Sequence, residues 1–319
     1  MKHTFIGVLT AGLMACGGAY AEDILFGSTS ASSSHYGYIV AVGKLINESG
    51  AGLNATVVET GATMDNIRRM ERGQLDLGII TTNVVQHAVA GTNEFDGKPQ
   101  DLQMLWVYAP SPQNVIMRAD SGIESLDQLN GVRLNPGIKG SATETTTEAV
   151  FDVLGIKPEY VRGSTTDIVD AIKDNRLPGY VKSGSPTALD SSTMDLATAT
   201  EIRVLGVTLE QADKIRANMP DISIVDIAAG VAEGIPAYTI WSFGVGIAAP
   251  TRMSEETAYQ IVNAVMSDKT AQGNAMASVK GADLAQMTLD YSTVPLHPGA
   301  VRWFEENGYS VPDKLKPTN

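Results

Sequence analysis

Cysteine is almost absent from this sequence, which has a single one, Cys16, among its 319 residues. Cys16 lies in an apolar N-terminal stretch with the pattern of a cleaved leader, so a mature chain would hold no cysteine. A chain without cysteine cannot form a disulfide framework, a thiolate nucleophile or a cysteine-ligated metal site. The sequence therefore argues against a small disulfide-rich extracellular scaffold.

Histidine is scarce as well, and the motifs of hydrolytic enzymes are missing. The four histidines are His3, His35, His87 and His297. No H-E-x-x-H motif or His-x-His pair occurs, which disfavours a zinc site. No G-x-S-x-G elbow is present, and no carboxylate pair stands out. A secreted hydrolase or transferase that uses a serine or His35 stays an alternative, although it lacks a base–nucleophile pair. We expect no catalytic residue, no metal and no cofactor.

Basic residues are outnumbered, with 23 Lys and Arg against 36 Asp and Glu and a formal net charge of −13. Such a chain is repelled by nucleic acids and anionic lipid surfaces, so neither is expected as a partner. Apolar runs long enough to span a bilayer are missing too, since a spanning helix needs about 20 residues. An anionic small ligand stays compatible with this charge, because helix amides can bind an anion locally.

The first 21 residues have the pattern of a secretory signal peptide. Lys2 supplies the positive start, residues 4–15 are apolar, and Ala19-Tyr20-Ala21 fits a small-x-small cleavage site. We therefore expect cleavage after Ala21 and a secreted protein. The alternative is a lipoprotein, because Leu-Met-Ala-Cys at 13–16 resembles the box in which Cys16 would carry lipid.

Strand-like and helix-like segments alternate along the rest of the chain, which predicts an α/β fold with parallel sheets. Residues 53–60 and 75–82 are apolar, strand-like segments, and each is followed by a helical pattern. About 298 residues remain after the leader, which is enough for two domains.

Two long apolar segments are suited to cross between two lobes: LWVYAPSPQNVIMRA at 105–119 and IWSFGVGIAAP at 240–250. The first contains prolines and predicts two strands around a bend. We expect lobe I to comprise residues 23–112 and 246–319, and lobe II residues 113–245.

Two strand-to-helix loops are rich in small hydroxyl residues: ILFGSTSASSSHYGY at 24–38 and NPGIKGSATETTT at 135–147. The first turn of a helix leaves amide groups unpaired, so such a loop can bind an anion. Gly137 and Gly140 would allow the backbone to approach a ligand closely. Either loop alone could be an ordinary capped helix start. The presence of two favours a shared cleft.

Taken in order, these segments resemble the solute-binding proteins of TRAP transporters, specifically the TAXI family. Residues 27–36 are similar to the family's Gly/Thr-rich first loop with paired tyrosines. ETGATMDNIRRMERGQLDLGIITTNVVQHAVAGTNEF at 59–95, GIESLDQLNGVRLNPGIKGSATE at 122–144 and HPGAVRWFEENG at 297–308 resemble its later segments. The resemblance covers nearly the whole mature chain.

The resemblance implies a two-lobed α/β periplasmic binding protein of type II-like architecture, with the ligand between the lobes. It also implies a monomer that delivers a small carboxylate to a TRAP membrane permease, whose uptake is driven by an ion gradient. A glutamate-like amino acid, a keto acid or a dicarboxylate would fit. The ligand-binding residues that we expect are Thr29, Ser30, Ser32, Ser34, His35, Tyr36, Thr63, Asn83, Gly140, Ser141, Ala142, Thr143, Gly184 and Pro186.

Departures from the family pattern bear on the ligand. His35 stands at the first of the two tyrosine positions, and Asn83 stands where an aspartate is common. The neutral Asn83 favours a ligand without an ammonium group. If His35 contacts the ligand, affinity should vary with pH near the ordinary histidine pKa of about 6.5. A periplasmic sensor that presents its closed form to a membrane kinase has the same expected fold and stays an alternative.

Overall fold

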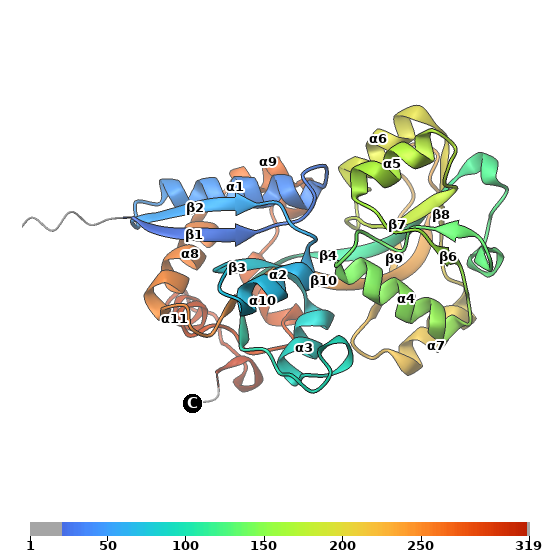
Figure 1. The fold of residues 1–319 in the computed structure, drawn as a ribbon. Coiled ribbons are helices and arrows are strands. Elements are labelled where there is room, and N and C mark those ends of the chain that lie inside the picture. Colours follow the sequence, from blue (N-terminus) through green and yellow to red (C-terminus); the bar gives the residue numbers. More distant parts are fainter. Residues whose placement is uncertain (1–20, 318–319) are drawn as a thin grey trace, which may run out of the picture.

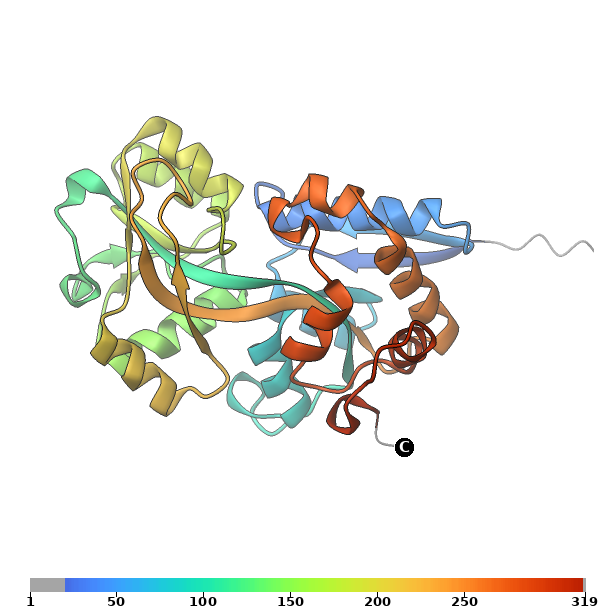
Figure 2. The same ribbon diagram turned by 180° about the vertical axis from the view of Figure 1, so that it is seen from behind.

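The computed structural model describes residues 21–317. Residues 1–20 of the expected 21-residue leader, which include Cys16, lie outside the described residues. Two groups of helices and strands lie side by side and are joined by two long strands, β4 (Leu102–Arg118) and β10 (Tyr238–Pro250) (Figure 1). Seen from behind, the same two strands run from one group into the other (Figure 2). We call the group with β1 to β3 lobe I and the group with α4 to α7 lobe II.

Lobe I contains a short parallel sheet that β10 and β4 extend. Its first three strands are β1 (Glu22–Gly27), β2 (Leu53–Val58) and β3 (Leu77–Thr81), in the order β2-β1-β3-β10-β4. The helices of this lobe are α1 (Ser34–Glu48), α2 (Thr63–Glu71), α3 (Thr82–Ala90), α8 (Glu255–Ser267), α9 (Ala271–Ala275), α10 (Leu284–Tyr291) and α11 (Pro298–Glu306).

Lobe II is built on the far halves of the two crossing strands. There β4 pairs with β7 (Gly179–Ser183) and β8 (Ile202–Leu205), while β10 pairs with β9 (Ser223–Ile227). A small separate pair is formed by β5 (Arg133–Leu134) and β6 (Glu159–Tyr160). The helices of this lobe are α4 (Ala142–Leu154), α5 (Thr165–Lys173), α6 (Ser191–Ala199) and α7 (Leu209–Asn218).

Strand β4 corrects one expectation from the sequence. The two strands expected around a bend are wrong, because β4 runs without interruption through Pro110 and Pro112. Proline has no backbone N–H group. Residues two apart in a strand point their backbone groups to the same edge, so Pro110 and Pro112 remove donors from one edge of β4 only. The carbonyl oxygen of Pro112 still accepts a hydrogen bond from the amide of Gly184 at 3.0 Å.

The sheet is mixed, whereas alternation alone predicted parallel sheets. Strands β1, β2 and β3 are parallel, but β10 is antiparallel to both β3 and β4. The reason is that β10 returns from lobe II, so its direction opposes that of β4. The expected lobe boundaries at 112/113 and 245/246 lie inside β4 and β10, and they stay a prediction.

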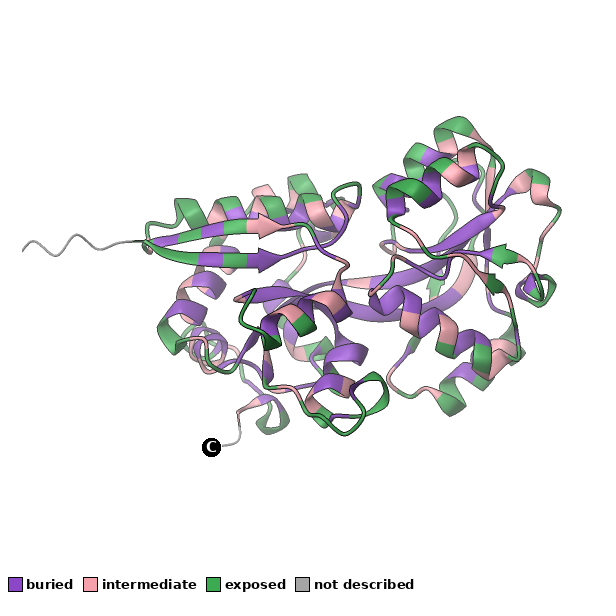
Figure 3. Ribbon diagram, viewed as in Figure 1, coloured by how far each residue is buried: buried purple, intermediate pink, exposed green. Residues whose placement is uncertain are grey.

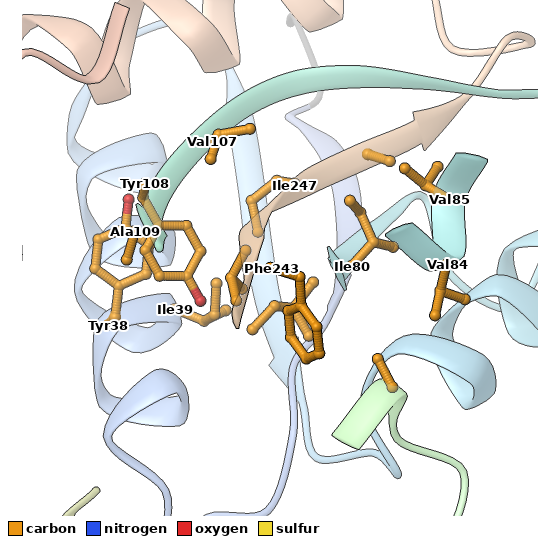
Figure 4. Packing of buried hydrophobic residues seen from close by; sticks show 14 of the residues in the cluster. Tyr38, Ile39, Ile80, Val84, Val85, Val107, Tyr108, Ala109, Phe243 and Ile247 are labelled. Carbon is orange, nitrogen blue, oxygen red and sulfur yellow. The ribbon is translucent and has the colours of Figure 1, made fainter. Parts of the chain in front are cut away.

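The core follows the crossing strands, which are buried along most of their length, while exposed residues gather on the outer helices (Figure 3). In lobe I, Tyr38 of α1 stacks on Tyr108 of β4 with ring centroids 4.0 Å apart, and Phe243 and Ile247 of β10 pack nearby (Figure 4). Between residues 21 and 317 no helix combines the length and the apolar character that crossing a membrane requires.

Candidate functional site

A cavity of about 40 Å³ lies between the lobes, next to the crossing strands. Lobe I contributes residues of the β1–α1 loop, the start of α2 and the end of β3, and lobe II contributes the start of α4 and strand β7. The two hydroxyl-rich loops expected to face one cleft both reach this cavity, the first through Thr29 and the second through Ser141. The sequence had predicted this convergence.

Four helices begin at the cavity. Residues at or beside their first turns line it: Ser33 caps α1, Thr63 opens α2, Thr81 precedes α3 and Ser141 caps α4. The N-terminus of a helix carries unpaired amide donors and the positive end of the helix dipole. Helix ends from both lobes therefore make this space favourable for an anion.

The start of α4 leaves two backbone donors available. The hydroxyl of Ser141 accepts the amide of Glu144 at 3.1 Å, and the hydroxyl of Thr143 donates to Gln113 at 2.7 Å. Both side chains thus hold the loop in place. The backbone amides of Ala142 and Thr143 have no acceptor among the residues that the structure describes. These amides are the free donors that α4 offers to the cavity.

Lys182, on β7, is the only Lys or Arg among the described residues that line the cavity. Its residue is 7% exposed, which is rare for lysine unless the ammonium is paired. The ammonium donates to the Ser33 hydroxyl at 3.3 Å and lies 3.6 Å from Asp190 Oδ1. An ammonium has three donors, so at least one further hydrogen bond remains for a ligand.

Asp190 is the buried carboxylate beside this lysine, and it ties the lobes together. Its Oδ2 accepts from the hydroxyl of Ser33 and the amide of Ser34 in lobe I, both at 3.0 Å. Its Oδ1 accepts from the amide and hydroxyl of Ser192 in lobe II. Burial alone would raise the pKa of Asp190, but Lys182 and the hydrogen bonds from Ser192 outweigh it and lower the pKa below the usual range.

His35 lines the same cavity as a neutral ring. Its Nδ1 lies 2.8 Å from the hydroxyl of Tyr108. The pKa of His35 is lowered to about 4, mainly by burial; Asp190 opposes this shift and Lys182 adds to it. The imidazole is therefore uncharged near neutral pH, and titration near 6.5 is not expected from this environment.

Six of the residues predicted to bind the ligand line the cavity. They come from the β1–α1 loop and from the starts of α1, α2 and α4. They are Thr29, His35, Thr63, Ser141, Ala142 and Thr143.

Four other predicted residues bridge the lobes without lining the cavity. The carbonyl of Ser32 and the hydroxyl of Ser34 bond to Ser191 at 2.8 and 2.9 Å. The side chain of Asn83 donates to Thr146 at 3.0 Å, and the carbonyl of Gly140 accepts the amide of Met64 at 2.9 Å. The structure is thus a closed form, with contacts across the cleft on several sides of the cavity.

The remaining four predicted residues do not belong to the cavity lining. Ser30 lines a groove outside the cavity and bonds to the Ser32 hydroxyl at 3.0 Å. Tyr36 and Pro186 are half-buried and lie outside the cavity lining. Gly184 packs so closely on Asn114 that a Cβ would come within 2.5 Å of its Nδ2.

Sequence reasoning missed Lys182 and Asp190. A single lysine in the apolar run Gly179–Ser183 was a usable signal, because a charge amid strand residues needs a partner. No local pattern could connect Asp190 with Ser33, which lies 157 residues away in the chain.

The fold resembles that of several solved structures. A protein of Bordetella bronchiseptica RB50 superposes with a TM-score of 0.56 at 13% identity, covering 91% of this chain and 98% of that chain. The periplasmic binding protein BugD superposes with a TM-score of 0.53 at 13% identity, covering 81% and 87%. A structure described as a periplasmic transporter gives 0.53 at 12% identity, covering 90% and 92%. At such identities the likeness concerns the fold.

The chain therefore has the mixed α/β fold of the periplasmic solute-binding proteins. It belongs to the NMT1-like family, which its sequence matches over residues 26–308.

Proposed function

We propose that this protein is the periplasmic solute-binding receptor of a TRAP transporter, of the TAXI type. It binds a small carboxylate between its lobes and delivers it to the membrane permease for uptake driven by an ion gradient. The TRAP and TAXI parts rest on the order of the sequence segments described above. Membership of the NMT1-like family and the fold support the broader role in solute binding.

The buried ammonium of Lys182, beside four helix N-termini in a closed cavity, carries the proposal for an anion. Carboxylate oxygens only accept hydrogen bonds, and the start of α4 supplies the free amides of Ala142 and Thr143 beside the ammonium of Lys182. Donors that are already fixed by the fold need little reorganisation when the ligand arrives. Each charge-assisted bond of this kind contributes on the order of 1.5–3 kcal/mol.

The donors come from both lobes, so a bound carboxylate would favour closure of the lobes. Lys182 and the start of α4 belong to lobe II, whereas Ser33, Thr63 and Thr81 belong to lobe I. A carboxylate held by both sets favours the closed arrangement, because only that arrangement satisfies all of its oxygens. The closed form is then the species that would be presented to the permease.

A thermal-shift screen of the purified protein against carboxylic acids and amino acids tests the binding role. A ligand that binds only the native state raises its melting temperature, and Lys182→Met should make that rise smaller. Lys214→Met is the matched control, because it deletes an exposed lysine of the same lobe. If no acid stabilises the wild type, or if both variants respond like the wild type, the proposed anion site is wrong.

Reconstituted uptake tests the TRAP assignment. The ligand-loaded protein is added to vesicles that contain a candidate TRAP permease of the same organism, with a sodium or proton gradient and without ATP. Uptake under these conditions supports the proposal, and uptake that needs ATP contradicts it.

A further inference from the structure

The cavity lining has an apolar part in addition to its hydrogen-bond donors. Ile79, Val181, Phe243 and Val245 line it with apolar side chains that are each at most 4% exposed. Of these, Phe243 is shown where β10 lies against the core of lobe I (Figure 4). A bound molecule would therefore meet hydrogen-bond donors in one part of the cavity and hydrocarbon in another.

No Asp or Glu belongs to the cavity lining within residues 21–317. The nearby carboxylate of Asp190 is occupied, since Ser33, Ser34 and Ser192 donate four hydrogen bonds to its two oxygens. A ligand ammonium would thus be buried without a counter-charge and beside the ammonium of Lys182. Burying an unpaired charge is strongly unfavourable, and the positive helix ends add to the repulsion.

A second carboxylate on the ligand would also find no cation to pair with in the described lining. Lys182 is the only fixed cation among the described lining residues, and the neutral ring of His35 adds no charge. The volume of about 40 Å³ is small beside the roughly 150 Å³ of an apolar cavity that binds benzene. The space therefore suits one carboxylate with a short uncharged remainder.

We propose that the ligand is a short monocarboxylate without an ammonium group, whose remainder is alkyl or carries only keto or hydroxyl groups. This inference rests on the proposed function and narrows it, since it removes amino acids and dicarboxylates from the ligand class. The uncharged hydroxyls of Thr29, Thr63 and Thr81 supply partners for a keto or hydroxyl oxygen. The hydroxyl of Thr81 is buried without a hydrogen-bond partner among the described residues, so it is free for that role.

Calorimetry on the wild-type protein tests the inference with three-carbon acids that differ in one group. The series is pyruvate, lactate and propionate against L-alanine and malonate, followed by the matching acids of four and five carbons. We expect a monocarboxylate without an amine to bind at least ~30-fold more tightly than the amine and the dicarboxylate of equal length, since an unpaired buried charge loses more than one hydrogen bond is worth.

The outcomes separate the two proposals. Equal or tighter binding of alanine, glutamate or a dicarboxylate overturns the narrowed ligand class and leaves carboxylate binding intact. If no acid of any class binds, both proposals are wrong. Preference for the uncharged remainder supports the inference.

A gain of function gives a second test. Thr81→Asp places a carboxylate in the cavity lining and should shift the preference toward the amine of each pair, whereas Thr81→Ser should keep the wild-type preference. Circular dichroism first establishes that each variant is folded. If a folded Thr81→Asp variant still does not bind amines, the lack of a carboxylate in the cavity is not the reason that amines are excluded.

Discussion

His87 joins the two lobes through its charge, and this contact predicts a pH-dependent stability. The ring lies on α3 of lobe I, with Nδ1 3.4 Å from Glu94 of the same lobe and Nε2 3.1 Å from Asp221 of lobe II. The neighbouring Asn93 side chain, 3.0 Å from both ring nitrogens, is uncharged. Contact with Asp221 first, and with Glu94 second, raises the pKa of His87 to about 9 against the opposing effect of burial.

The sign and size of the effect follow from this shift. The pKa is raised in the folded state, so the stabilisation is complete below the unfolded pKa of about 6.5 and is lost as pH rises through about 9. Each pKa unit corresponds to about 1.4 kcal/mol, which would give ~3 kcal/mol for a fully shielded site. The three side chains are partly exposed, and water screens their interaction, so we expect on the order of 1–2 kcal/mol.

The assay is urea unfolding of the wild type and His87→Gln from pH 6 to pH 10. The difference in unfolding free energy should be largest at pH 6 and should approach zero near pH 10. Asp221→Asn should lose most of the same pH dependence, because it removes the larger cause of the shift. A difference that stays constant over this range, or grows with pH, would refute the reasoning.

The remaining predictions concern the cavity. Lys182→Met should weaken ligand binding about ten- to hundred-fold by calorimetry, from the loss of one charge-assisted bond, and an equal effect of Lys214→Met would contradict a local cause. Ser141→Ala removes the cap of α4 and should lower the unfolding free energy by about 1 kcal/mol; an unchanged denaturant midpoint would show that the cap is replaceable. His35 should not make ligand affinity depend on pH between 6 and 8, because its pKa lies near 4. If the wild type shows a pH dependence in this range and His35→Gln abolishes it, this prediction is wrong. Asp190→Asn should weaken closure, seen as a larger radius of gyration in X-ray scattering of the unliganded protein, and an unchanged radius would argue against a bridging role.

Local patterns were informative wherever the cause was local. The helix start at Ser141, with its cap and the glycines before it, depends on residues a few positions apart. The N-cap bond from Glu144 to Ser141 spans three residues. For the same reason the strand-loop-helix order, and with it the α/β class, could be predicted from the sequence.

The cavity chemistry was decided by contacts between distant residues. Lys182 meets Ser33 across 149 residues of chain, and Asn83 meets Thr146 across 63. Periodicity describes which face of an element is buried, but it carries no information on which element lies opposite. Thus the bond from Asn83 to Thr146 of the other lobe could not be predicted from local pattern, and the ligand contact expected of Asn83 stays a prediction.

By itself the sequence determined an acidic, cysteine-poor α/β protein with two hydroxyl-rich helix starts, because composition, caps and periodicity are local properties. Only the tertiary structure decided that β4 runs on through its prolines and that β10 returns antiparallel beside it. It also decided that the Asp190 carboxylate accepts its hydrogen bonds from residues of the two lobes. Lys182 is therefore the charged side chain that lines the cavity. The physical reason is that a buried charge takes its role from all the partners around it, and the path of the whole chain sets those partners.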